Sequence, residues 1–533
     1  MRYPLTADTL LVNAQLWSSA QPAGSDADSI ALQGGRIMAM GTHAEMKALS
    51  GAGSTVLDLE GRMLLPGFCD SHIHLQEYAR SHDVVHCETD TIDIALKRIA
   101  ARAEELEPGE WLLGHGWRMD QWGRFGTIAE LDAVCQGHPT YITSKSLHAA
   151  WVNTKAFEAA GVTNTVNDPP GGTFNRDEHG NLTGIILENA LLEVSGAIPA
   201  PKTERLAAIL DHAQKHLHAY GITSVHDFDR TDCLRALQHL RAEGKLALRV
   251  LKQIRNLEVE PYIEAGLYSG FGDDWIRLGQ VKFFADGAIG PHTAHMLHAY
   301  EGTVSDVGIP TMDPDELYEL VRHCVDNRLA VSIHAIGDAA NRMVLSLYER
   351  LASEGHPRLP LPHRIEHLQL IHPDDISRIR RDDLIISMQP YHAVSDMFIA
   401  QEHWGERCEN AYAWRSVIDT GATVIFGSDA PVETPSPLIG IHAAVTRRRA
   451  TGEPGPEGWY PAQRITREEA LAAYTSTPPS AAGVDSTQGK ILPGFMADLQ
   501  VYDADLLTCE VDELLEIQPC GVMVDGEWVI RTF

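Results

Sequence analysis

The sequence predicts a mixed α/β protein built on a (β/α)8, TIM-like barrel that is joined to a small β domain made from both ends of the chain. Short apolar runs alternate with helical patterns over most of the length, and each terminus carries β-rich runs with hairpin signals. Strands that alternate with helices are typical of a parallel sheet, and eight such strands close into a barrel.

Eight strand-like runs support the barrel. The first is the apolar run at 63–74, and the last ends at a Gly-Ser-Asp turn. The eight runs cover residues 63–74, 222–227, 246–251, 279–287, 330–338, 364–368, 385–390 and 423–429. Helix signals separate them: Asp313-Pro314 opens one helix, and Thr466 with Glu469 forms a capping box for another. The barrel region is expected to span 63–486.

The two chain ends are expected to form one domain. Residues 1–62 contain the hairpin signal Gln33-Gly34-Gly35, and residues 487–533 contain a second one, Asp525-Gly526. Either half alone would expose an apolar face. We therefore expect 1–62 and 487–533 to pair as a composite β domain.

The segment 75–205 interrupts the barrel rhythm after its first strand. It mixes helical patterns, such as Ile92 to Leu106 and Ile128 to Val134, with turns rich in Gly, Pro and Asn. We interpret it as an inserted α+β subdomain that shapes a substrate pocket.

Composition narrows the class of protein. The chain has 533 residues, 44% of them apolar, and carries a formal charge of −30, which argues against nucleic acid or an anionic membrane as a partner. No apolar stretch has the length of a membrane span, and residues 1–6 lack a signal-peptide core, so a cytoplasmic location is expected. Eight cysteines without a CxxC pair suit reduced thiols. The expected partner is a small-molecule substrate, and a homo-oligomer stays open.

The motif Asp70-Ser71-His72-Ile73-His74 is the first candidate for chemistry. Residues two apart on a strand face the same side, so His72 and His74 present two imidazoles together, with Asp70 on that face. Such a pair suits a divalent transition metal. Chance also produces such pairs: His216-Leu217-His218 lies in a helical pattern, where the two side chains diverge.

Further polar residues stand where other strand runs end. They are Lys282, His334, His367 and Asp429. Each histidine alone could be a buried, hydrogen-bonded residue, and Asp429 could cap a turn. Lys282 is flanked by apolar residues, and a buried lysine with a lowered pKa could act as a base or react with carbon dioxide to form a carbamate.

Seven motifs in order resemble the metal-dependent amidohydrolase superfamily, and most closely its YtcJ-like (amidohydrolase-3) branch, which includes N-substituted formamide deformylase. The resemblance extends over nearly the whole chain. The motifs are Pro66-Gly67-Phe68-Cys69-Asp70-Ser71-His72-Ile73-His74, Gly221-Ile222-Thr223-Ser224-Val225-His226-Asp227, Val281-Lys282-Phe283-Phe284-Ala285-Asp286-Gly287, His334-Ala335-Ile336-Gly337-Asp338, His363-Arg364-Ile365-Glu366-His367, Gly427-Ser428-Asp429-Ala430-Pro431 and Gly489-Lys490-Ile491-Leu492-Pro493-Gly494-Phe495-Met496-Ala497-Asp498-Leu499.

The resemblance implies a distorted barrel, a β-sandwich from both termini, and a centre of one or two divalent metals, with zinc expected and iron or manganese as alternatives. His72, His74 and Asp429 would hold the more buried metal. Lys282, carboxylated on its Nζ atom, would bridge to a second metal held by His334 and His367. These six residues are the complete implied ligand set.

Two further positions follow from the same resemblance. His148 matches a histidine of the family's inserted domain and would face the substrate. Pro291-His292 stands where relatives often carry Ser-Arg, so substrate preference is not inherited at that point.

The expected reaction is hydrolysis of a carbon–nitrogen bond other than a peptide bond, in an amide, N-formyl or N-acyl substrate. Asp429 would act as general base and then general acid for a hydroxide activated by the metal, and His148 or His334 would help to stabilise the oxyanion. A mononuclear deaminase and an ester or lactone hydrolase are alternatives on the same centre. A catalytically silent scaffold on the same fold is the alternative from another class.

Overall fold

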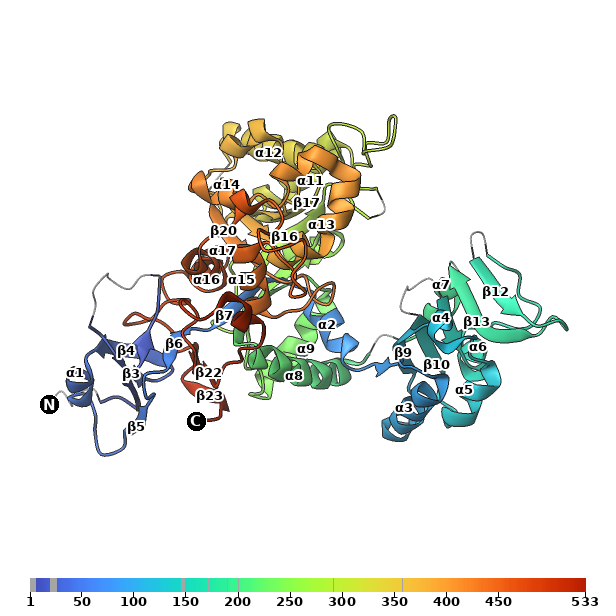
Figure 1. Ribbon diagram of the computed structural model, residues 1–533, viewed down its shortest axis with the longest axis horizontal. Helices are drawn as coiled ribbons and strands as arrows, with labels where there is room; N and C mark the ends of the chain where they lie inside the picture. The colour runs from blue at the N-terminus through green and yellow to red at the C-terminus, as the bar shows by residue number, and fades with distance from the viewer. Residues whose placement is uncertain are drawn as a thin grey trace. The chain divides into compact units, whose positions relative to one another are not determined.

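The computed structural model describes residues 6–19, 26–144, 149–169, 172–188, 190–199, 201–290, 292–356 and 358–533. They form two compact units. The first joins Met1–Tyr78 to Leu206–Phe533 and holds the barrel and the strands of both termini; the second is Ala79–Arg205 (Figure 1).

Eight parallel strands form the predicted barrel. In sheet order they are β7 (Phe68–Ile73), β14 (Ile222–Asp227), β15 (Arg249–Arg255), β16 (Ile276–Phe284), β17 (Val331–Ala335), β18 (His363–His367), β19 (Leu384–Met388) and β20 (Thr423–Phe426). The last strand returns to the first through a parallel bridge between Ile73 and Ala430. Backbone hydrogen bonds from Asp429 N to His72 O (2.6 Å) and from His74 N to Ala430 O (2.9 Å) complete this closure.

Helices follow the barrel strands as the alternating pattern predicts. They are α2 (Leu75–Ser81), α8 (Thr203–Ala219), α9 (Thr231–Ala242), α10 (Glu260–Glu264), α11 (Pro314–Asp326), α12 (Asp338–Ser353), α13 (Pro390–Trp404), α14 (Trp414–Asp419), α15 (Pro437–Thr446), α16 (Arg467–Tyr474) and α17 (Pro478–Ala481). The predicted caps are present: Asp313 accepts from the backbone of Asp315 and Glu316, and Thr466 with Glu469 forms a capping box.

The predicted first strand, 63–74, is two strands. Residues Met63–Pro66 form β6 in a terminal sheet, and Phe68–Ile73 form β7 in the barrel. The chain changes sheets at Gly67, where a Cβ atom would lie 2.2 Å from Thr223 Oγ1, so a side chain has no room there. The predicted third strand, 246–251, is displaced: β15 starts at Arg249 and extends to Arg255.

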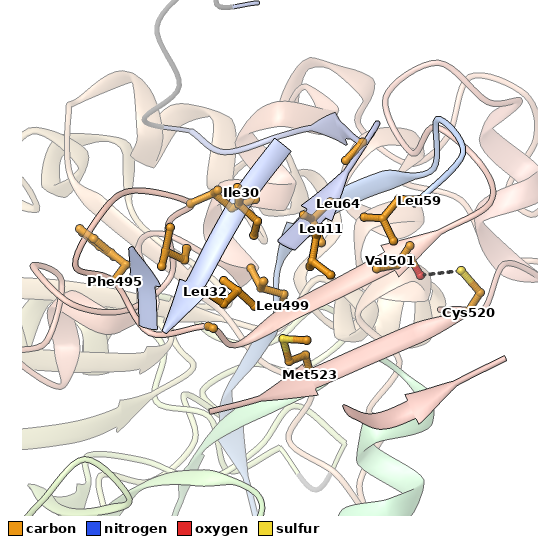
Figure 2. Packing of buried hydrophobic residues seen from close by; sticks show 14 residues of the cluster. Leu11, Ile30, Leu32, Leu59, Leu64, Phe495, Leu499, Val501, Cys520 and Met523 are labelled. Carbon is orange, nitrogen blue, oxygen red and sulfur yellow. Dashed lines mark hydrogen bonds between the residues drawn. The ribbon is translucent and has the colours of Figure 1, made fainter. Parts of the chain in front are cut away.

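The strands of both termini form two sheets that pack as a sandwich. One sheet contains β4 (Arg36–Gly41), β3 (Ser29–Gln33), β1 (Thr9–Val12) and β5 (Thr55–Asp58); the other contains β2 (Gln15–Leu16), β6, β21 (Leu499–Tyr502), β22 (Gly521–Val524) and β23 (Glu527–Arg531). The short helix α1 (His43–Lys47) follows β4. Figure 2 shows the shared core, in which Leu11 and Ile30 of one sheet pack with Leu64, Val501 and Met523 of the other.

The second unit is an α+β fold around a six-stranded sheet. Its strands, in sheet order, are β12 (Gly172–Arg176), β13 (Leu182–Glu188), β11 (Ala149–Val152), β10 (Thr140–Ser144), β9 (Leu112–Trp117) and β8 (Val85–His86). The helices are α3 (Ile92–Glu105), α4 (Met119–Trp122), α5 (Ile128–Val134), α6 (Thr154–Ala159) and α7 (Ala190–Ser195). Consecutive strand residues point to opposite faces of the sheet, and Tyr141 and Ile142 belong to different apolar clusters, so both faces of the sheet are covered.

Two expectations from composition can be compared with the structure. The eight cysteines are all unpaired thiols. Within the described ranges, no helix combines the length and the apolar character that a bilayer crossing requires.

Candidate metal centre

All six residues of the implied ligand set line one cavity of about 460 Å³ at the carboxyl ends of the barrel strands. His72 is the last residue but one of β7, and His74 directly follows that strand. Lys282 lies in β16, His334 in β17 and His367 in β18, and Asp429 follows β20. His148 lies outside the described residues, so its expected position facing the substrate stays a prediction.

The two histidines of the first strand are each held from behind by a carboxylate. The Nδ1–H of His72 donates to Glu366 Oε2 at 2.6 Å, and the Nδ1–H of His74 donates to Asp229 Oδ1 at 3.2 Å. The opposite nitrogens, both Nε2, approach Asp429 Oδ1 at 3.5 and 3.4 Å. A ring whose N–H is tied to a carboxylate presents its other nitrogen as a lone pair, the arrangement found at metal-ligating histidines.

The histidines of strands β17 and β18 follow the same rule. His334 donates through Nε2–H to the carbonyl of Gly287 at 3.0 Å, which leaves Nδ1 as the lone pair. His367 donates through Nδ1–H to Gln389 Oε1 at 2.8 Å, which leaves Nε2. The His334 and His367 rings lie 4.6 Å apart between centroids. Four imidazoles are therefore oriented by hydrogen bonds that fix which nitrogen can bind a metal.

Asp429 stands at the centre of these rings. Ligand atoms of His72, His367 and Asp429 all lie within 4.8 Å of one another. Asp429 and His367 both have positive φ angles, +62° and +75°, which are uncommon for residues other than glycine. Gly427 enables the approach of this turn to the first strand, because a Cβ atom there would lie 2.4 Å from the backbone nitrogen of His72. Backbone strain of this kind concentrates at functional sites.

Burial keeps three of the rings neutral. It lowers the pKa of His72 to about 4 and that of His334 to about 3, and in both cases the nearby Lys282 cation adds to the effect. Burial and the neighbouring His334 lower the pKa of His367 well below its usual value. Neutral imidazole is the form that binds a metal, so these rings need no deprotonation near pH 7.

His74 and Asp429 behave differently. Burial alone would lower the pKa of His74, but Asp229 and Asp429 outweigh it and raise the pKa to about 10. Burial alone would raise the pKa of Asp429, but His72, His74 and His367 hold it well below its usual range. His74 thus holds a proton between two carboxylates, a position that a divalent cation would take over with release of that proton.

Lys282 is a buried lysine that faces the cavity. Its Nζ atom lies over the rings of Phe228 and Phe284, at 4.7 and 5.1 Å from their centroids. Burial lowers its pKa to about 8, against the opposing effect of Glu366. A lysine in this state exposes a substantial neutral fraction near pH 8, and neutral amine is the form that reacts with carbon dioxide.

A polar network inside the barrel supports Glu366. Arg364 Nη2 donates to Glu366 Oε2 at 3.1 Å, and Glu366 Oε1 accepts from Ser332 Oγ at 2.6 Å. Arg364 further contacts His226 Nδ1 at 2.9 Å and donates to the carbonyl of Ser71 at 2.8 Å. The carboxylate that orients His72 is therefore itself fixed, fully buried, at the end of a chain of hydrogen bonds.

The second group with metal-type side chains has a structural explanation. Asp227, Asp229 and Cys233 offer ligand atoms within 4.8 Å. Lys252, which is 1% exposed, lies with its Nζ atom 2.9 Å from Asp227 Oδ2 and donates to the backbone carbonyl of Asp229. The Lys252 ammonium group already supplies a cation to this cluster, and it contacts the backbone of Asp229, the residue whose carboxylate orients His74.

Two residues singled out in the sequence lie elsewhere. Asp70 was expected on the face of His72 and His74, but its carboxylate accepts from Ser428 N at 2.9 Å and Ser428 Oγ at 2.5 Å and is absent from the cavity lining. His292 points away from the lining residues: its Nδ1 lies 3.1 Å from Asp306 Oδ2, and its Nε2 lies 3.1 Å from His403 Nδ1. It ties a loop together.

Other cavity residues have no counterpart in the sequence-based prediction. The polar ones are Gln369, His392, Asp396 and Glu433, and the larger apolar ones are Phe284, Ile289, Ile336 and Val432. Gln369 and His392 follow the ends of β18 and β19 by two and four residues. Both residues lie just beyond the predicted runs 364–368 and 385–390, so their position after a strand end was the signal that could have found them.

Comparison with known proteins gives consistent results. A sequence model of the family described as "Amidohydrolase family" matches residues 55–530. Protein LONG AFTER FAR-RED 3 of Arabidopsis thaliana is 30% identical over 94% of this chain and 88% of its own length. N-substituted formamide deformylase of Arthrobacter pascens is 28% identical over 97% of both chains. An uncharacterized metal-dependent hydrolase from Pyrococcus furiosus superimposes with a TM-score of 0.80 at 27% identity, over 94% of this chain and 100% of that structure.

Proposed function

Because this chain belongs to the amidohydrolase family and is a metal-dependent hydrolase, we propose that it hydrolyses carbon–nitrogen bonds other than peptide bonds, in small amide, N-formyl or N-acyl substrates. One observation carries the proposal. Four imidazoles line the cavity with Asp429, and each is tied through one N–H to a fixed acceptor, which leaves its other ring nitrogen for a metal.

The ligand set fits divalent metal. His72, His74 and Asp429 would hold one ion, and His334 and His367 a second, with a carboxylated Lys282 between them; nitrogen-rich sets of this kind suit zinc, with iron or manganese as alternatives. When bound, such a metal lowers the pKa of a coordinated water and polarises a carbonyl group.

Asp429 is the residue placed to move the proton. It would accept the proton of the attacking water, because its carboxylate is ionised and its Oδ1 lies beside the two rings expected to hold the metal. Its Oδ1 faces His72 and His74, whereas Oδ2 lies toward His392, 3.9 Å from that ring's Nε2. We propose that Asp429 then delivers this proton to the leaving nitrogen.

The relatives support the bond type. The relative from Arthrobacter pascens, matched over 97% of both chains, is named a deformylase of N-substituted formamides. A formamide and an N-acyl amine present the same reacting group, a carbonyl carbon bonded to nitrogen.

The position of Lys282 favours a two-metal centre over the one-metal centre of a deaminase. A one-metal site has no need of a bridging ligand, yet a lysine with lowered pKa faces this cavity beside His334 and His367. Two metals per chain and a carbamate on Lys282 would support the two-metal centre. One metal and an unmodified lysine would favour the deaminase.

The test is a screen of purified protein of measured metal content against N-formyl amines, N-acyl amines, esters, lactones and aminopurines. We expect release of amine from the first two classes. Asp429→Asn should abolish turnover while the metal content stays nearly unchanged, because the other ligands remain. Full activity of that variant would refute the role of Asp429, and hydrolysis of esters alone would refute the bond type.

A further inference from the structure

His392 differs from the other histidines of the cavity. It lies in the first turn of α13, its side chain is 8% exposed, and it lines the cavity beside Asp429. Among the described residues, no hydrogen-bond partner reaches its Nε2 atom. A buried polar atom without a partner is costly, and such atoms in a native structure call for an explanation.

The hydrogen bond that holds the His392 ring runs in the opposite direction from those of the other four histidines, because here the ring nitrogen accepts. Its Nδ1 lies 3.3 Å from the amide nitrogen of Gln369, which is a donor, so Nδ1 accepts and the proton resides on Nε2. The carboxylate of Asp429, 3.9 Å from Nε2, favours the same tautomer but is too distant for a hydrogen bond. His72, His334 and His367 therefore each leave one ring nitrogen as a lone pair, whereas His392 leaves a buried N–H without a partner.

An N–H donor is what the reaction still lacks. The sequence suggested His334 or His148 for stabilising the oxyanion, but the N–H of His334 is engaged by Gly287, and His148 lies outside the described residues. Of the described histidines that line the cavity, His392 is the one with a ring N–H left over. Gln369, 3% exposed, holds that ring from behind.

We propose that His392 is a catalytic residue whose Nε2–H donates a hydrogen bond to the carbonyl oxygen of the substrate. This inference rests on the proposed hydrolysis of a carbon–nitrogen bond. As the water oxygen bonds to the carbonyl carbon, the π electrons move onto the carbonyl oxygen, and the proton of the water goes to Asp429. His392 keeps its own proton and stabilises the oxyanion. When the carbonyl re-forms, the C–N bond breaks and Asp429 returns the proton to the nitrogen.

Removing a single oxyanion donor from an enzyme typically lowers kcat by about 10²–10³-fold. We expect His392→Ala to lose about 10²-fold in kcat with KM changed less than about threefold, because the bond strengthens only as charge develops. His392→Asn, which keeps an N–H donor on a shorter side chain, should recover part of that loss. His403→Asn, on the same helix but outside the cavity lining, is the matched control and should retain wild-type rates.

Binding of a tetrahedral phosphonamidate analogue separates a chemical role from a structural one. The holoenzyme and each variant, at equal metal content, are titrated with the analogue and with the matching amide. His392→Ala should weaken analogue binding by about the factor lost in kcat/KM and leave amide binding within about threefold. Equal weakening of both ligands, or wild-type kcat in His392→Ala, would overturn the assignment. If the wild-type enzyme hydrolyses no C–N substrate at all, the proposed function fails first, and the two failures are thus distinguishable.

Discussion

Replacing Asp229 by asparagine should weaken metal binding because His74 Nδ1–H would lose the carboxylate that accepts its hydrogen bond. In the native structure, Asp229 Oδ2 accepts from the backbone N–H groups of Gln76 and Glu77 at 2.5 and 3.2 Å, while Oδ1 accepts from His74 Nδ1–H at 3.2 Å. In the variant, the two backbone donors would claim the amide oxygen. The amide NH₂ would then donate to His74 Nδ1, so that the remaining ring proton stays on Nε2, the atom that approaches Asp429.

The expected cost follows from that reversal. His74 can bind metal in Asp229→Asn only after breaking its new hydrogen bond, and loss of such an outer partner typically lowers metal affinity about 10- to 100-fold. This corresponds to about 1.4–2.7 kcal/mol. The substitution is nearly isosteric and leaves both backbone contacts satisfied, so we expect little change in folding.

The assay is competition with a chromophoric chelator, combined with elemental analysis and circular dichroism of the apoprotein. Asp512→Asn is a matched control: Asp512 Oδ1 lies 3.0 Å from His442 Nε2, and neither residue lines the cavity. Asp229→Asn should lose affinity, and Asp512→Asn should not. An Asp229→Asn protein that binds metal as tightly as the wild type would refute the argument that these outer hydrogen bonds define the ligand atoms.

Three further outcomes follow. Bicarbonate added during metal reconstitution should raise activity, and the increase should be larger at about pH 8.5 than at pH 7. Burial lowers the pKa of Lys282 to about 8, and only its neutral amine reacts with carbon dioxide. Activity that is the same with and without bicarbonate at both pH values would count against the carbamate. Lys252→Met should lower the free energy of unfolding by about 3–5 kcal/mol, measured from the denaturant midpoint, because Asp227 would stay charged and buried without the ammonium group that lies 2.9 Å away. An unchanged midpoint would show that Asp227 is neutral. Neutral N-acyl amines should be hydrolysed faster than N-acyl amino acids, since Asp396 and Glu433 line the cavity beside the proposed metal ligands and would repel a carboxylate on the substrate. Comparison of kcat/KM for matched pairs checks this, and a preference for the anionic substrate would contradict it.

The features that the sequence predicted well are those encoded in a short segment or in a periodic pattern of apolar and polar residues. The hairpins at Gln33-Gly34-Gly35 and Asp525-Gly526 join β3 to β4 and β22 to β23, as expected from glycine at positive φ. The eight strands and the capping box at Thr466 were equally readable. The convergence of six candidate ligands at one cavity followed from a rule of the fold, because the ends of parallel barrel strands meet at one rim.

The errors came from contacts between distant parts of the chain. Nothing local distinguishes Leu246–Leu248 from a strand, but β15 starts at Arg249, whose buried guanidinium lies 2.5 Å from Asp498 Oδ2 in the terminal sandwich. Asp70 was expected on the face of His72 and His74 from its spacing, but its carboxylate is bound to Ser428, which lies 358 residues further along the chain. The acceptor behind His74 was invisible for the same reason: Asp229 lies 155 residues further along the chain.

Closing the barrel and building the site depend on the same few atoms. The hydrogen bond from Asp429 N to His72 O joins the last strand to the first. It also places the carboxylate between the Nε2 atoms of His72 and His74 on one side and Nε2 of His392 on the other. The positive φ of Asp429 is therefore the backbone conformation in which this residue makes the hydrogen bond that closes the barrel and also places its carboxylate between His72 and His74 on one side and His392 on the other. Under the proposed hydrolysis, Asp429 would accept the proton of the water and return it to the leaving nitrogen, and the N–H of His392, on the other side of the carboxylate, would stabilise the oxyanion.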